Sequence, residues 1–199
     1  MTELPLFPLS GVLLPYGRMP LQIFEQRYLD LVKDCLRNDS GFGVVWLRRG
    51  AEVASGENGS EFGDYGTVAR IVDWDQLPNG LLGITIEGSD TFELHETRRA
   101  DNGLVIGEVS LDEALSPLPM IPAWSSLEDV LRSLEGHPHV ERMALDIDYG
   151  NAWQVGFILA QLLPLEEAIK YELLGSESLD VLMRELDIIL NQISGTEAG

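Results

Sequence analysis

The chain has 199 residues, 45% of them hydrophobic, which is enough for one or two domains with a real core. Its 33 acidic and 13 basic residues give a net charge of −20. This charge opposes binding to nucleic acid or to anionic membranes, because both are recognised through Lys and Arg. The single cysteine, Cys35, excludes an internal disulfide. No apolar stretch approaches the roughly 20 residues that span a bilayer, and no basic signal region opens the chain, so a cytoplasmic location is expected.

The first segment is an apolar run that prolines interrupt. Residues 4–15 read Leu-Pro-Leu-Phe-Pro-Leu-Ser-Gly-Val-Leu-Leu-Pro. Proline fixes φ and lacks a backbone donor, so this run is expected to be extended edge structure that wraps on a core, not a helix or a central strand. Further on, apolar residues recur at helical spacing and predict one face of a first helix: Phe24, Tyr28, Leu31, Val32, Cys35 and Leu36.

Strand patterns dominate the chain up to about residue 117. Residues 42–47 form a short apolar β run, whereas residues 50–65 are glycine-rich without periodicity and predict a mobile loop. Two separate hairpins are expected next, one turning at residues 78–80 and the other at residues 101–103.

From residue 118 helical spacing replaces the alternating pattern. Ser125-x-x-Glu128 has the pattern of a capping box, and Asn151 is a candidate cap for a later helix. Strands followed by helices, instead of alternating with them, predict an α+β fold. We therefore expect a β-rich part at 1–117 and a helical part at 118–199.

Candidate metal-binding and catalytic groups are sparse. His137-Pro138-His139 offers two ligands, fewer than zinc needs, and a surface loop is the simpler interpretation. Residues 146–150 (Asp-Ile-Asp-Tyr-Gly) contain part of a calcium loop without its spaced ligands and closing glutamate. Asp73 and Asp75 would share a strand face, but no nucleophile accompanies them, so a hydrolase that uses Asp73, Asp75 or Asp146 is the weakest hypothesis. No metal and no cofactor are expected.

Stretches along most of the chain resemble the amino-terminal substrate-binding domain of Lon proteases. The most specific is residues 4–28, with Leu-Pro-Leu-Phe-Pro-Leu and Phe-Glu-x-Arg-Tyr motifs. The others are residues 66–71 (Gly-Thr-Val-Ala-Arg-Ile), 77–80 (Leu-Pro-Asn-Gly), 86–88 (Ile-Glu-Gly) and 162–174, where Leu-Pro-Leu precedes a helix. The resemblance implies an α+β fold in which a β-rich, PUA-like pseudo-barrel is followed by a C-terminal helical bundle. It also implies a domain that helps to recognise substrates and to assemble the hexamer without catalysing.

Two absences from the sequence agree with a binding domain. It contains no P-loop motif for a nucleotide. A serine–lysine pair needs a desolvated lysine, but Lys170 lies among glutamates, where it is expected to be an intrahelical ion-pair partner. The ATPase and protease domains of Lon are therefore not expected in this chain.

Recognition of unfolded or extended polypeptide segments is the expected function, with a protease or a chaperone as a further partner class. The alternative is a small-ligand sensor with a pocket between the β-rich and helical parts. The candidate binding residues are motif residues and large aromatics of the kind found at binding hot spots: Glu25, Arg27, Tyr28, Trp46, Trp74, Trp153 and Phe157. Their structural alternatives are pinning of the first helix for the charged pair and core packing for the aromatics. The site is expected near the junction with the helices and the 50–65 loop, and the sequence leaves the client and the oligomeric state open.

Overall fold

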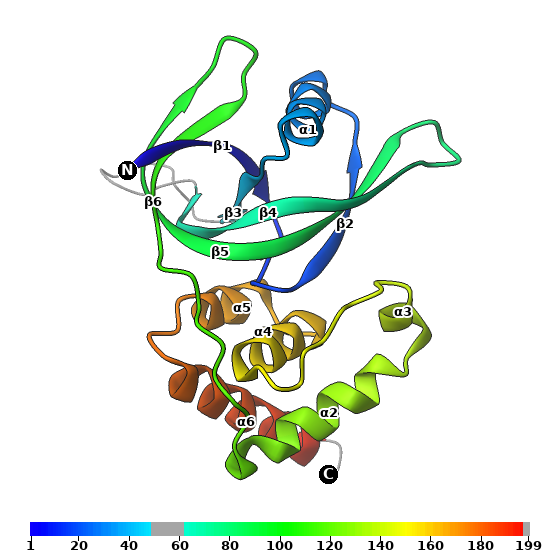
Figure 1. The fold of residues 1–199 in the computed structure, drawn as a ribbon, viewed down its shortest axis with the longest axis vertical. Coiled ribbons are helices and arrows are strands. Elements are labelled where there is room, and N and C mark those ends of the chain that lie inside the picture. The colour runs from blue at the N-terminus through cyan, green and yellow to red at the C-terminus, as the bar shows by residue number, and fades with distance from the viewer. Residues whose placement is uncertain (49–61, 197–199) are drawn as a thin grey trace. The chain divides into compact units, whose positions relative to one another are not determined.

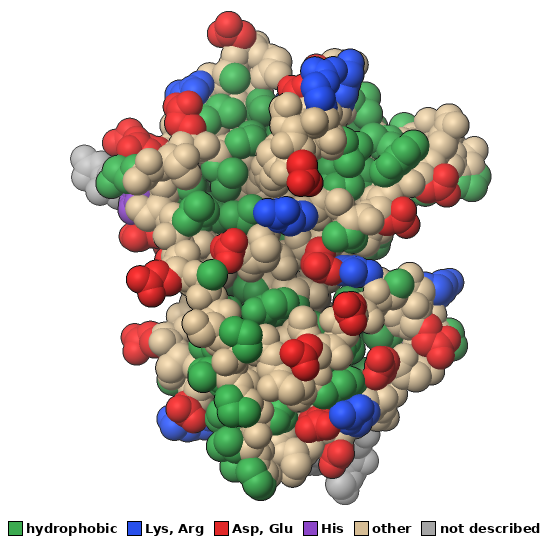
Figure 2. All heavy atoms as spheres, in the orientation of Figure 1, with side chains coloured by type: hydrophobic (Ala, Val, Ile, Leu, Met, Phe, Trp, Pro, Cys, Tyr) green, Lys and Arg blue, Asp and Glu red, His purple; other side chains and the backbone are tan. Residues whose placement is uncertain are grey.

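The structure, a computed structural model, describes residues 1–48 and 62–196. The chain divides into two compact units, Met1–Ala114 and Leu115–Gly199. Figure 1 shows strands and one helix in the first unit and helices in the second. This arrangement confirms the predicted α+β class. Acidic side chains spread over the visible face of both units, as the net charge of −20 leads one to expect (Figure 2).

A six-stranded sheet builds the first unit. Its strands are β1 (Thr2–Leu9), β2 (Arg18–Ile23), β3 (Phe42–Leu47), β4 (Phe62–Gln76), β5 (Leu82–Arg99) and β6 (Val105–Leu111). The order is β2-β5-β4-β3-β1-β6, and an additional pairing between β5 and β6 closes β5, β4, β3, β1 and β6 into a ring. β2 is attached to this ring through β5 alone, so it is the edge strand of the described sheet.

The prediction that the proline-rich start is an edge was wrong, because β1 is paired on both sides. β6 pairs with residues 2–6 of β1, and β3 pairs with residues 6–9. Pro5 therefore faces a partner strand only in β6, and Pro8 only in β3. On its other side each proline has no paired strand, so its missing N–H breaks no hydrogen bond of the sheet there. An interior strand can therefore hold two prolines.

Helix α1 (Gln26–Asn38) buries the expected apolar face against the core of the ring, but the face is shorter than predicted. Tyr28, Leu31, Val32 and Cys35 are buried. Phe24 precedes the helix and is 71% exposed, and Leu36 is 47% exposed. Since the helix begins only at Gln26, the spacing from Phe24 to Tyr28 is not helical spacing at all.

Two expectations for the middle of the chain change. Residues 62–65 are the start of β4 and not part of a loop, while residues 50–61 of the predicted loop lie outside the described residues. The two hairpins share one continuous strand, because the 18-residue β5 pairs with β2 and β4 through its first part and with β6 through its last part. Gly80 and Gly103 form the two turns, both with φ of +81°.

The second unit is helical. After the 3₁₀ turn η1 (Pro122–Trp124) its helices are α2 (Ser125–Glu135), α3 (Pro138–Glu141), α4 (Ala152–Leu162), α5 (Glu167–Leu174) and α6 (Leu179–Thr196). Asn151 caps α4 as predicted, since its Oδ1 accepts a hydrogen bond from the Trp153 N–H at 3.2 Å. The capping box at Ser125 is not formed, because η1 runs directly into α2 and makes Trp124 the N-cap, without a side-chain cap bond.

Close helix packing forms the core of the second unit. A Cβ added at Gly156 of α4 would lie 3.0 Å from Leu182 Cδ2 and 3.1 Å from Met183 Sδ, both on α6. The two helices therefore approach each other at a position where only a glycine fits without adjustment. Over the described ranges, no helix has both the length and the apolar character needed to cross a membrane.

Candidate functional site

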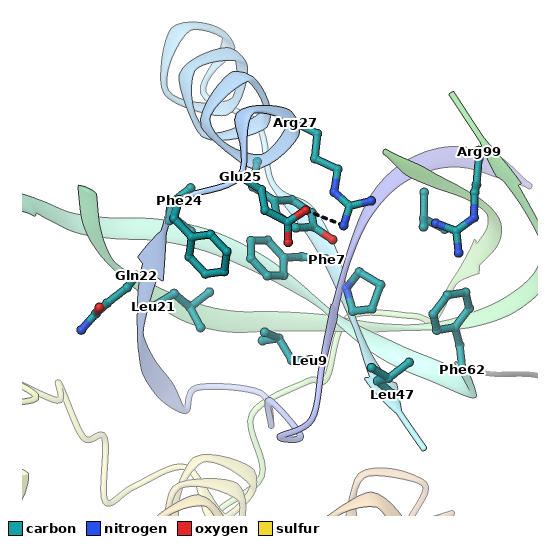
Figure 3. Close-up of a pocket in the computed structure, with 14 residues that line it drawn as sticks. Phe7, Leu9, Leu21, Gln22, Phe24, Glu25, Arg27, Leu47, Phe62 and Arg99 are labelled. Carbon is teal, nitrogen blue, oxygen red and sulfur yellow. Dashed lines mark ion pairs between the residues drawn. The ribbon is translucent and has the colours of Figure 1, made fainter. Parts of the chain in front are cut away.

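The first unit contains a cavity of about 380 Å³ between β1, β2 and the start of α1, which we call the aromatic pocket (Figure 3). Its walls are mainly apolar and carry two arginines and one glutamate. The described residues that line it are Phe7, Pro8, Leu9, Leu21, Gln22, Ile23, Phe24, Glu25, Arg27, Tyr28, Leu47, Phe62, Arg99 and Val105. All of them belong to the first unit.

Stacked rings form one wall of the aromatic pocket. Phe7 of β1 stacks on Tyr28 of α1 with ring centroids 4.0 Å apart and planes 18° from parallel. Phe24 stands at the end of β2 with its ring largely in solvent, 71% exposed. A large apolar ring with this exposure beside a buried pair gives the pocket an apolar rim that a partner could cover.

Arg27 forms an ion pair with Glu25 at the edge of the aromatic pocket and ties α1 to the turn after β5 through a hydrogen bond. Arg27 Nη2 lies 2.6 Å from Glu25 Oε2, and Arg27 Nη1 donates to the Gly103 carbonyl oxygen at 2.8 Å. The guanidinium carbon also lies 4.8 Å from the centre of the Tyr28 ring. Burial raises the pKa of the Tyr28 phenol above its ordinary value, and the positive charge of Arg27 partly opposes this effect.

Arg27 retains one unsatisfied donor. Its Nε is buried and has no hydrogen-bond partner among the described residues. A buried donor without a partner costs about 1–3 kcal/mol, so this geometry of Arg27 carries an energetic cost within the fold. Within a chain of net charge −20, the pocket wall holds two arginines, Arg27 and Arg99, against the single carboxylate of Glu25.

The side chains of the aromatic pocket are mainly apolar groups and hydrogen-bond donors. Among the described residues that line the aromatic pocket there is no Ser, Cys, His or Lys. The two lining residues that could act as nucleophiles are already engaged, since Tyr28 stacks on Phe7 and Glu25 pairs with Arg27. The pocket can instead bury apolar side chains and donate hydrogen bonds to oxygens through its arginines.

A second cavity of about 260 Å³ adjoins the other side of β2, and we call it the Trp74 pocket. The described residues that line it are Pro20, Leu21, Gln22, Asp73, Trp74, Asp75, Leu77, Gly83, Ile84 and Thr85. Trp74 is 61% exposed. The Asp73 carboxylate accepts a hydrogen bond from the backbone N–H of Trp74 at 2.9 Å, and the Asp75 carboxylate accepts one from the backbone N–H of Gln76 at 2.7 Å. Each carboxylate is therefore fixed through one oxygen.

The sequence-predicted binding residues fall in four places. Glu25, Arg27 and Tyr28 come together in the aromatic pocket, and Trp74 lies in the pocket named after it. Trp46 is half-buried in β3 and is not among the described residues that line either pocket. The remaining pair lies in the second unit, where Trp153 and Phe157 stack at 5.7 Å and are 9% and 3% exposed. Trp153 and Phe157 are therefore core-packing residues, the structural alternative to a binding role for them.

Sequence reasoning missed the residues that the sheet brings to the aromatic pocket. Phe7, Phe62 and Arg99 come from three different strands and were not proposed. The only local sign was the abrupt change at Phe24, where an apolar extended run meets a helix.

The candidate metal ligands have structural roles. His137 Nδ1 accepts a hydrogen bond from the His139 N–H at 3.2 Å and so caps α3. Asp148 Oδ1 accepts one from the Gly150 N–H at 2.8 Å and closes a turn. Among the described residues, no three or more His, Cys, Asp or Glu side chains are grouped to hold a metal ion.

Fold and pocket together define a mixed α+β protein with an apolar pocket in its first unit. Comparison with known families is more specific. The model of the ATP-dependent protease La (LON) substrate-binding domain matches residues 3–192. The chain belongs to this family.

Known proteins and structures support the assignment. The chain is 34% identical over 94 residues to Lon protease 2 of Myxococcus xanthus, and 25% identical over 203 aligned positions to the Lon protease of Brevibacillus choshinensis. These alignments cover 47% and 95% of this chain but only 11% and 25% of the relatives, so the chain spans a small part of their length.

Solved structures agree over nearly the whole chain. A Lon N-terminal domain protein from Xanthomonas campestris superposes with a TM-score of 0.72 at 39% identity, covering 96% of this chain and 98% of that one. The N-terminal domain of a Mycobacterium avium complex Lon protease superposes with a TM-score of 0.59 at 11% identity, covering 93% and 96%, and shows the shared fold alone.

Proposed function

We propose that this chain is a non-catalytic recognition domain that binds an extended, apolar segment of an unfolded polypeptide in the aromatic pocket. The observation that carries the proposal is the open apolar pocket beside the 71%-exposed Phe24, in a chain whose family is described by substrate binding. A protease or a chaperone that handles the same clients is the further partner class.

The size and lining of the aromatic pocket favour side chains over a large rigid ligand. Its volume of about 380 Å³ is near the lower end of ligand pockets, roughly 300–1,000 Å³. A client segment would insert apolar side chains against Phe7, Leu21 and Phe24 while its backbone stays outside. Full burial of a Phe side chain contributes about 1.5–3 kcal/mol, so covering Phe24 is a substantial part of a micromolar affinity.

Binding of a reduced, carboxymethylated and fluorescently labelled model polypeptide tests the proposal by fluorescence anisotropy. We expect a dissociation constant of about 10 μM or below, and about tenfold weaker binding for Phe24→Ser because its ring can no longer be buried. The matched control is Leu111→Ser, which removes a 54%-exposed apolar side chain of the same unit outside the pocket. This control should bind like the wild type.

Two results would contradict the proposed function. The first is no binding of the model polypeptide at concentrations of about 50 μM, roughly five times the expected dissociation constant. The second is equal binding by Phe24→Ser and Leu111→Ser, since this would place the contact elsewhere. Circular dichroism of both variants confirms that neither result comes from unfolding.

A further inference from the structure

We infer that the bound segment adds to the free edge of β2 as a further strand, with successive side chains entering the aromatic pocket and the Trp74 pocket. This inference rests on the proposed function and specifies how the client is held. Main-chain hydrogen bonds would supply affinity for any extended sequence, and the two pockets would supply preference for particular side chains.

The edge of β2 is available for such pairing. In the part of the chain that the structure describes, β2 stands at the end of the strand order and pairs with β5 alone. Pro20 and Gln22 of β2 are exposed. An edge strand presents unpaired N–H and C=O groups and is a template for another extended chain.

Pro20 indicates which backbone groups of β2 point outward. Proline has no N–H, and in a sheet its nitrogen side normally faces away from the partner strand. In an antiparallel pair, residues two apart direct their backbone groups to the same side. Gln22 therefore directs its N–H group to the free edge, whereas the N–H groups of Met19 and Leu21 point to β5.

The two pockets meet at Leu21 and Gln22 of β2, which line both of them and whose side chains point to opposite faces of the strand. Figure 3 shows Leu21 directed toward Phe7 and Leu9, and Gln22 directed away from them. On that second face Gln22 lies opposite Gly83 of β5, and both residues line the Trp74 pocket. An added strand would present its side chains alternately to the same two faces, since successive residues of a strand point to opposite sides.

The two pockets favour different side chains. The aromatic pocket offers rings and aliphatic groups. The Trp74 pocket carries the carboxylates of Asp73 and Asp75 on one face of β4 with the apolar side chain of Leu77 beside them, which suits the stem and charge of Arg or Lys through apolar and ionic contact. The net charge of −20 attracts the same basic residue. The expected occupant is therefore an extended segment in which an apolar residue is followed by a basic one.

Backbone methylation of a probe tests strand addition directly. The probe is a fluorescein-labelled decapeptide with a central alternation of Phe and Arg, and its binding to the full chain is measured by anisotropy. N-methylation at every second central residue should weaken binding about fivefold or more in one register and less than about twofold in the other, because only one set of N–H groups faces β2. Equal effects in both registers overturn the inference.

A pair of variants at one position gives an independent readout. Gln22→Pro removes the outward N–H of β2, whereas Gln22→Ala keeps it and removes the same side chain. We expect about fivefold weaker decapeptide binding for Gln22→Pro than for Gln22→Ala. Equal binding by two folded variants overturns strand addition, and should Gln22→Pro fail to fold, the methylation series decides alone.

Failure of the inference is distinguishable from failure of the proposed function. If the wild-type chain does not bind the unmethylated decapeptide or the unfolded polypeptide, both are overturned. If it binds, Phe24→Ser weakens binding, and neither methylation register nor Gln22→Pro has an effect, only strand addition is overturned.

The role of the Trp74 pocket has its own test. Exchange of Arg for Glu in the probe should weaken binding to the wild type, and the Asp73→Asn/Asp75→Asn double variant should reduce this preference for Arg at least threefold. An unchanged preference overturns the assigned role of the Trp74 pocket.

Discussion

Phe7 of β1 and Tyr28 of α1 stack with centroids 4.0 Å apart, and this contact joins the strand ring to its helix where the aromatic pocket begins. Both residues are 8% exposed. Phe7 also lies 5.9 Å, centroid to centroid, from Phe42. The wall of the proposed binding pocket is therefore continuous with the core of the first unit, which fixes the wall before any client binds.

Truncation of the stacked pair should lower stability. Phe7→Ala removes a buried ring from the core and should reduce the free energy of unfolding by about 3–5 kcal/mol. Tyr28→Phe keeps the stacked ring and should cost less than about 1 kcal/mol. Urea denaturation followed by far-UV circular dichroism measures both values. Similar losses for the two variants would mean that ring stacking is not what holds α1 in place.

Gly66 of β4 should not accept a side chain. A Cβ at this position would lie 2.3 Å from the Val44 carbonyl oxygen and 2.7 Å from Phe92 Cζ. Gly66→Ala should therefore lower the free energy of unfolding by about 2–3 kcal/mol or prevent folding, because the backbone oxygen cannot move aside easily. Val72→Ala, at a 42%-exposed position of the same strand, is the control and should cost less than about 1 kcal/mol. A neutral Gly66→Ala would contradict the packing of β4 against β3.

Tyr149 should titrate above the ordinary pKa of a tyrosine phenol. Burial raises the pKa of Tyr149 to about 12, and its hydrogen bond to Glu135 Oε2 at 2.7 Å acts in the same direction. Because the folded pKa lies above the ordinary 10.0, the stabilisation is complete below pH 10 and is lost as the pH rises toward 12.

Ultraviolet difference titration checks this value. Wild type minus Tyr149→Phe should show one phenol that ionises near pH 12, and Glu135→Gln should move it toward 10.0 without reaching it, because burial remains. A phenol of Tyr149 that ionises near pH 10.0 in the folded protein would refute the prediction.

Cys35 should react slowly with thiol reagents. It is 4% exposed, and burial raises the pKa of its thiol while a hydrogen bond with Ser40 partly opposes this. The neutral thiol is favoured in the fold, so its contribution to stability is present at neutral pH and is lost as the pH rises past the ordinary thiol range. With Ellman's reagent at pH 8, we expect labelling about a hundredfold slower than in the urea-unfolded chain. Equal labelling rates in the folded and unfolded chain would show that the buried face of α1 is accessible to the reagent.

Local sequence signals predicted the class of fold because strands and helices occupy separate parts of the chain. They failed at β1, where prolines at positions 5 and 8 suggested an edge. Whether a strand is interior depends on which distant segments pair with it, and here β6 and β3 each pair with a different half. The prediction that Phe24 belongs to the helix was also wrong. Its spacing to Tyr28 fits a helix, but the helix starts only at Gln26.

The site was predictable only where its residues are neighbours in sequence. Glu25, Arg27 and Tyr28 share one short motif and come together in the aromatic pocket. Phe62 and Arg99 reach the same pocket from β4 and β5, through closure of the strand ring, which no local pattern encodes. Large aromatics on a helix look alike in sequence whether they face solvent or the core, so composition alone could not place Trp153 and Phe157.

The most direct test of the central claim is a two-dimensional ¹H–¹⁵N TROSY titration of the labelled chain with the unmethylated Phe/Arg decapeptide. The account predicts saturable shift changes that centre on β2 and on Phe7, Leu9 and Phe24, and slower hydrogen exchange for the Gln22 amide in the complex. Shift changes confined to residues 115–199, or none at saturating peptide, would contradict it.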